Sequence, residues 1–373
     1  MKRDEKIDIV KGLGIIFMVL RHSRAPYSDF VLLFHMAIFF IASGYLYNPA
    51  CAKTVKSAMG YIKKKIKSLY LPYLGYTLAF ILLNNFFLKI NVYTDNPKFL
   101  DGAMVETTYA VLGEYYSLKT IIKQVVKALF FRAGTQLGGA FWFFQVLFMV
   151  QIGYTIVEFL VNKITANHTK QQLIQTAVSV ALLLVGYWCF LTGHGLYGLN
   201  RVCSVYILIH IGTMLRDYSV TDRIWKVLGR WGTIIISFLT LLGGYQRGYI
   251  ALDGNNIENP IFFLVMSLAG WFLLYSISDL MVEKRCFVNN GLSYISRHSV
   301  PIIALHFLCF KIVNALVVIV YDMNIWMIAA FPVLTVSGMW WLLYAIIGVG
   351  GPLLMRAGAC KLKMYVAIGW RKC

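Results

Sequence analysis

Long apolar runs separated by short polar segments dominate the chain. Ten of these runs approach the length of roughly 20 residues that a helix needs to cross a lipid bilayer. The pattern predicts an all-α polytopic membrane protein, a bundle of about ten transmembrane helices forming a single domain over residues 1–373. The predicted spans are about 8–24, 30–48, 70–90, 139–161, 173–192, 200–216, 232–246, 260–281, 299–321 and 325–350.

Composition agrees with this fold class. Of the residues, 59% are hydrophobic and 14% are charged, whereas soluble domains have roughly 45–50% apolar and 25% charged residues. The opening MKRDEKIDIVK has no small-residue cleavage site, so we expect the first apolar run to be a retained helix. The seven cysteines show no ligand spacing, so neither a metal site nor a disulfide framework is predicted.

The net charge of +19 would suggest a nucleic-acid partner in a soluble protein. In this chain most Lys and Arg residues fall in alternate loops, which the positive-inside rule explains if both termini lie in the cytoplasm. We therefore expect the lipid bilayer as a partner and no nucleic acid. The predicted location is the cell membrane, as a multi-pass protein of a bacterial inner or plasma membrane.

The longest segment predicted to lie outside, 91–138, has two parts. It opens with the turn-rich NVYTDNPKFLDG and continues as SLKTIIKQVVKALFFR. In the second part Lys119, Lys123 and Lys127 recur every four residues beside apolar positions, which predicts an amphipathic helix lying in the membrane interface. Such a helix fits a lid over a site and a structural skirt around the bundle equally well.

The stretch KGLGIIFMVLRHSR places two ionisable side chains in the first predicted helix. Lys11 and His22 are eleven residues apart, which at about 100° per residue is three turns plus roughly 20°, so both lie on one face. The rise between them is about 16 Å. Ionisable groups at membrane depth are functional candidates because they are costly there. The alternative is that Lys11 reaches the inner surface and His22 lies at the outer interface.

A second histidine lies in FHMAIFFIASGYLYN, the second predicted helix. His35 would be level with His22 if residues 25–29 form a short outer hairpin. A buried neutral imidazole can act as a general base, because its pKa near neutrality suits proton removal from a hydroxyl. A structural, hydrogen-bonded role for His35 is the alternative.

The ninth predicted helix also carries two ionisable side chains. His306 could bond a neighbouring helix only. Lys311 needs a partner, because an ammonium group inside a membrane helix is costly.

These segments together resemble the acyltransferase-3 family of integral-membrane acyltransferases. DIVKGLGIIFMVLRHS and FHMAIFFIASGYLYN resemble its paired opening motifs. The specific part is a basic residue and a histidine with ten residues between them, matched by Lys11 and His22. Further similar blocks are YIKKKIKSLYLPY, GGAFWFFQVLF and NNGLSYISRHSVPIIALHF.

The resemblance implies that the bundle moves an acyl group, usually acetyl, from cytoplasmic acyl-coenzyme A to a hydroxyl on the outer side. The implied acceptor is a carbohydrate of the cell surface or envelope, and the donor substrate is acetyl-CoA. By the family's motif, His22 is the catalytic histidine, Lys11 the basic residue associated with the donor and His35 a further catalytic-pocket residue. Arg201, a donor-binding candidate, precedes His210, which stands where the family is usually apolar.

The residues themselves fit this chemistry. The phosphates of coenzyme A need cations, which the KKKIK run with Lys64 and Lys65 offers, although such a run is also the ordinary positive-inside signal. His22 could take the proton of the acceptor hydroxyl as its oxygen attacks the thioester, or form an acyl-histidine intermediate. An exporter or flippase of lipid-linked saccharides is the competing class, although no internal repeat supports it.

Overall fold

The computed structural model describes residues 4–103, 111–334 and 336–370. Over these ranges the chain forms helices and no strand, apart from one isolated bridge between Ala251 and Asn256. The all-α prediction is therefore confirmed. Residues 104–110 of the predicted outer segment and the basic residues Lys2, Arg3, Arg371 and Lys372 lie outside the described ranges.

The helices fall into two compact units. Unit 1 comprises the chain up to Met18, Tyr27–Pro72 and Trp142–Arg297, and unit 2 comprises Val19–Pro26, Tyr73–Phe141 and the chain from His298 onward. Helices α1 (Glu5–His22) and α5 (Leu71–Leu82) contribute to both.

The elements of unit 1 are α2 (Ser28–Leu32), α3 (Ala37–Tyr45), the 3-10 turn Pro49–Ala52, α4 (Val55–Lys65), the π turn Ile66–Tyr70, α9 (Trp142–Ile164), α10 (His168–Thr192), α11 (Leu199–Asp217), α12 (Val220–Tyr245), α13 (Pro260–Glu283) and α14 (Asn289–Arg297). Those of unit 2 are α6 (Asn84–Lys89), α7 (Lys98–Ala103), α8 (Leu118–Leu129), the 3-10 turns Gln136–Gly138 and Ile325–Ala329, α15 (Ser299–Val320) and α16 (Trp340–Trp370).

Cap residues set where several of these helices begin. The side chain of Asn167 accepts a hydrogen bond from the backbone of Lys170, and Asn259 caps α13 directly before Pro260. Ser117 caps α8 in the same way. Side-chain acceptors at this position satisfy backbone N–H groups that have no partner inside the helix, and proline suits the first helical position.

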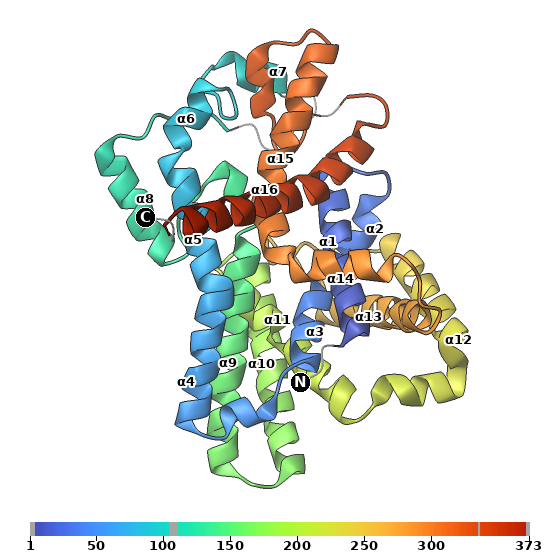
Figure 1. Cartoon of the computed structure of the whole chain (residues 1–373). Coiled ribbons are helices and arrows are strands. Elements are labelled where there is room, and N and C mark those ends of the chain that lie inside the picture. The colour runs from blue at the N-terminus through green and yellow to red at the C-terminus, as the bar shows by residue number, and fades with distance from the viewer. Residues whose placement is uncertain (1–3, 104–110, 335, 371–373) are drawn as a thin grey trace. The chain divides into compact units, whose positions relative to one another are not determined.

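Close packing in unit 1 relies on glycine. Figure 1 shows α9, α10 and α11 side by side, and α3 packs against α11. A side chain at Gly44 of α3 would collide with the carbonyl of Ile209, and one at Gly212 of α11 with that of Ile41. The two backbones therefore touch directly, as is common where small residues line the contact between membrane helices.

In unit 2, α15 packs against α16, and the segment between them is tied to α15. Lys311 Nζ donates to the carbonyls of Ala329 and Ala330 at 2.8 Å each, and Asn314 Nδ2 donates to Ala330 at 2.8 Å. The predicted span 325–350 is wrong at its start. The long helix begins at Trp340, because side chains of α15 occupy the backbone carbonyls near 328–330 that a continuous helix would use itself.

Seven helices of the described residues are long and apolar enough to cross a membrane. The predicted runs 8–24, 70–90 and 200–216 are not among them, since 70–90 is divided between α5 and α6 and the other two are rich in polar residues. The count of ten spans and the cytoplasmic termini stay predictions. So does the interfacial position of α8, which leaves Leu118, Ile122 and Val126 exposed.

Candidate active site

His22 is the last residue of α1 and belongs to unit 2. Its ring centroid lies 5.2 Å from that of His306, with the planes 31° apart, and 4.8 Å from that of Phe307. Gly348 of α16 lies against Val19 of the same turn of α1, where a side chain would not fit. The sequence-predicted histidine is thus held beside a second imidazole and a phenyl ring.

His306 is completely buried in α15. Its Nδ1 lies 3.0 Å from the carbonyl oxygen of Ile302 and 3.1 Å from that of Ile303. A carbonyl oxygen only accepts, so Nδ1 carries the proton and Nε2 offers a lone pair. Among the described residues Nε2 has no hydrogen-bond partner. Sequence reasoning missed His306 as a site residue, because only the fold brings α15 against the end of α1.

Phenylalanine rings pack against this pair of histidines. The Phe307 ring lies 4.0 Å from the His306 ring and 4.6 Å from the Phe331 ring. A Cβ atom at position 139 would lie only 3.0 Å from the Phe331 ring and 3.3 Å from the Phe307 ring, so Gly139 leaves room for both rings. The sequence indicated that Lys311 needs a partner, and the backbone carbonyls directly before Phe331 are its hydrogen-bond acceptors. These hydrogen bonds therefore help to position the Phe331 ring.

The predicted donor-binding lysines lie in unit 1. Burial, followed by the charges of Lys64 and Lys11, lowers the pKa of Lys65 to about 8. The structure thus brings Lys11 within electrostatic range of Lys65, which sequence separation alone does not suggest. The Lys65 ammonium lies 4.8 Å from the centre of the Tyr61 ring, a cation–π contact.

Lys64 lines a pocket of about 420 Å³ on α4 and the π turn after it. Ammonium groups that converge on one open pocket suit a ligand carrying several phosphates. The other lining residues are Gly60, Lys63, Lys67 and Ser68.

Two further predicted residues lie elsewhere in unit 1. His35 is buried between α2 and α3, and its Nδ1 donates to the carbonyl of Val31 at 2.9 Å. It belongs to unit 1 and His22 to unit 2, so the expectation that His35 is level with His22 stays a prediction. The Arg201 guanidinium lies 5.7 Å from the centre of the Trp142 ring.

His210, the departure from the family pattern, is part of a buried polar cluster. Its Nδ1 and the Tyr154 hydroxyl are 3.3 Å apart, and its Nε2 lies 2.8 Å from the Thr176 hydroxyl. Both ring nitrogens are therefore used in hydrogen bonds that join α9, α10 and α11.

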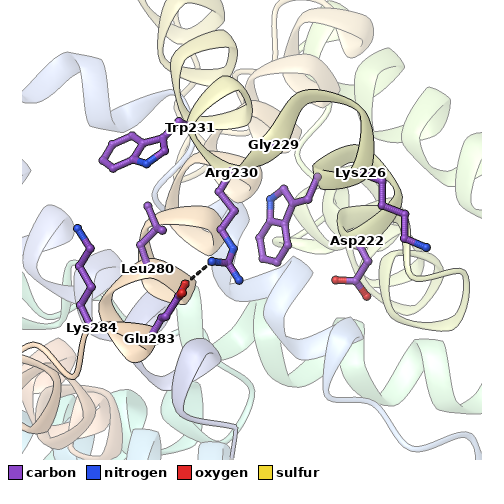
Figure 2. A pocket seen from close by; sticks show the side chains of 9 residues that line it. Asp222, Lys226, Gly229, Arg230, Trp231, Leu280, Glu283 and Lys284 are labelled. Carbon is purple, nitrogen blue, oxygen red and sulfur yellow. Dashed lines mark hydrogen bonds and ion pairs between the residues drawn. The ribbon is translucent and has the colours of Figure 1, made fainter.

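A second pocket, of about 620 Å³, lies between α12 and α13 and was not predicted. Gly229, with φ of 67°, interrupts α12 there. Figure 2 shows Arg230 turned toward Glu283, with which it forms an ion pair, while Lys226 and Lys284 lie on opposite sides of the view. Arg230 Nε also lies 2.7 Å from Asp279, so two carboxylates offset its charge.

Within the described ranges, no group of three or more His, Cys, Asp or Glu side chains is arranged to hold a metal ion.

Comparison with known proteins decides the family. The family model of the acyltransferase-3 domain, described as an acyltransferase domain, matches residues 4–347. The chain belongs to the acyltransferase-3 family. No curated protein and no solved structure matches the chain. Membership makes the chain a membrane acyltransferase.

Proposed function

We propose that this acyltransferase moves an acetyl group from cytoplasmic acetyl-CoA to a hydroxyl of a surface or cell-envelope carbohydrate, with His22 as the general base. The observation that carries the proposal is the position of His22 against the imidazole of His306 and the ring of Phe307. This arrangement puts a proton acceptor in an aromatic environment, where water that would hydrolyse the thioester is disfavoured.

The reaction balances with a neutral His22. The imidazole takes the proton of the acceptor hydroxyl while that oxygen bonds to the thioester carbonyl carbon. When the tetrahedral intermediate collapses, the carbon–sulfur bond breaks and the imidazolium returns the proton to the departing thiolate of coenzyme A. The products are the acetyl ester and free coenzyme A, and His22 is neutral again.

The donor would be bound through its phosphates. The pocket lined by Lys63, Lys64 and Lys67 offers three ammonium groups, and Lys65 and Lys11 add charge nearby. Lys11 and His22 both lie in α1, where the helical rise separates them by about 16 Å. This distance is close to the reach of the pantetheine arm of coenzyme A. We assign Arg201 to the donor-binding set and His35 to the catalytic pocket on the resemblance alone.

Ester analysis of the host's glycans tests the proposal. Cells that carry wild-type protein, His22→Ala or His168→Ala at equal membrane abundance are compared by mass spectrometry of their surface and envelope carbohydrates. His168 is an exposed histidine at the start of α10, so its substitution is the matched control. We expect acetyl esters with the wild type and the control, and a loss of at least about a hundredfold with His22→Ala.

Two outcomes would count against the proposal. Unchanged ester content with His22→Ala would remove His22 as the base. A fall in the amount of surface saccharide, with its degree of acetylation unchanged, would instead support an exporter of lipid-linked saccharides.

A further inference from the structure

We infer that Nε2 of His306 is a binding site for a second hydroxyl of the acyl acceptor, so that the enzyme recognises two hydroxyls on adjacent carbons. The inference rests on the proposed function, because it takes His22 as the base. It adds a substrate class, a vicinal diol, and a residue that selects it.

Nε2 of His306 is a buried acceptor without a hydrogen-bond partner among the described residues. Nδ1 of His306 is committed to the carbonyls of Ile302 and Ile303, which leaves Nε2 as the acceptor. Nε2 is the ring nitrogen distant from Cβ, so it points away from the backbone of α15. It is buried and has no partner among the described residues. Buried polar atoms are nearly always hydrogen-bonded, and an exception of this kind calls for an explanation such as a missing ligand.

The side chains around His306 offer Nε2 no hydrogen-bond donor among the described residues. His306 is surrounded by the phenylalanine rings of residues 307 and 310, at 4.0 and 5.6 Å, which donate no conventional hydrogen bond. The His22 ring is 5.2 Å away, yet the Nε2 atom accepts no hydrogen bond from it. A group that arrives with the substrate can supply this donor, and a hydroxyl is the donor that a carbohydrate brings.

The distance between the His22 and His306 rings suits two neighbouring hydroxyls. Each ring nitrogen lies about 1 Å from its ring centroid, and hydrogen bonds to hydroxyl oxygens are about 2.8 Å long. Two imidazoles with centroids 5.2 Å apart can therefore bind two hydroxyl oxygens on adjacent carbons, one oxygen to each ring. The proton of the reacting hydroxyl goes to His22 during the reaction, so we assign the hydrogen bond to His306 to a second hydroxyl of the acceptor.

A matched pair of substitutions tests this inference. His306→Gln keeps an acceptor oxygen on a flexible side chain, and His306→Met has a similar length with no comparable acceptor. Both lose the bonds to the carbonyls of α15, so the difference between them reports on the acceptor. At equal membrane abundance we expect His306→Met to lower acetyl-ester content at least about tenfold, with partial recovery in His306→Gln.

Two further measurements distinguish acceptor binding by His306 from a purely structural role. Binding of coenzyme A to the purified variants should match the wild type, because the lysine pocket is distant in sequence and untouched. NMR of the glycan isolated from wild-type cells should place the ester beside a carbon with a free hydroxyl.

Three results would overturn the inference: wild-type ester content in His306→Met, equal activity in the two variants, or an ester with no neighbouring hydroxyl. If His22→Ala is also fully active, the proposed function itself has failed. If His22→Ala is inactive while His306→Met is active, only the role of His306 is wrong.

Discussion

Residue type leaves open which nitrogen of a histidine is available, and in His306 the backbone decides it. The helix carbonyls at Ile302 and Ile303 take the Nδ1 proton and leave Nε2 as an acceptor. The sequence placed His306 in a membrane helix and offered only a bond to a neighbouring helix. His22, in contrast, could be selected from its spacing to Lys11, because helical periodicity puts both on one face.

Lys65 leads to a prediction on pH dependence. Its pKa of about 8 means that it loses its positive charge as the pH rises through that value. A phosphate-bearing donor binds the charged form better, so the KM for acetyl-CoA should rise several-fold between about pH 7 and pH 9. Initial rates at varied donor concentration across this range measure it.

The control for Lys65 is Lys65→Arg. A guanidinium stays protonated throughout this pH range, so the rise in KM should be much smaller in this variant. An equal rise in both proteins would show that another group, or the donor itself, causes the pH dependence.

Among the elements, the conformation of the segment between α15 and α16 could not be predicted from the local sequence pattern. Its apolar residues 325–334 look like the start of a helix, yet Asn314 holds them in another conformation. Asn314 Nδ2 donates to the carbonyls of Ile328 and Ala330, and its Oδ1 accepts from the Leu334 backbone and the Tyr344 hydroxyl. A side chain 14 to 20 residues away competes with helix formation, and no local pattern records that competition.

Asn314→Leu should therefore destabilise this segment. The substitution leaves buried backbone groups without partners, at a cost of about 2 kcal/mol. We expect a lower midpoint of thermal unfolding in detergent, together with reduced activity because Phe331, which follows these carbonyls, packs on Phe307.

The exposed Ile312 on the same helix offers a control for Asn314. Ile312→Val should leave both the unfolding midpoint and the activity near the wild-type values. A midpoint for Asn314→Leu that equals this control would show that the hydrogen bonds of Asn314 do not hold the segment.

At the scale of the whole molecule, the distribution of charge predicts orientation. The excess of Lys and Arg in alternate loops of a chain with net charge +19 favours both termini in the cytoplasm. Reporter fusions at the C-terminus measure this. A green fluorescent protein should be fluorescent there and an alkaline phosphatase inactive, and the opposite pattern would overturn the predicted topology.

The sequence by itself determined the all-helical membrane class, the family, and the candidacy of Lys11 and His22. These follow from composition, local periodicity and motif spacing, which are properties of neighbouring residues. Only the tertiary structure decided that His306 lies against His22 and that the charge of Lys11 lowers the pKa of Lys65. It also decided that side chains of α15 set the conformation of the segment before α16. Such contacts join residues far apart in the chain, and packing between helices, rather than local preference, selects them.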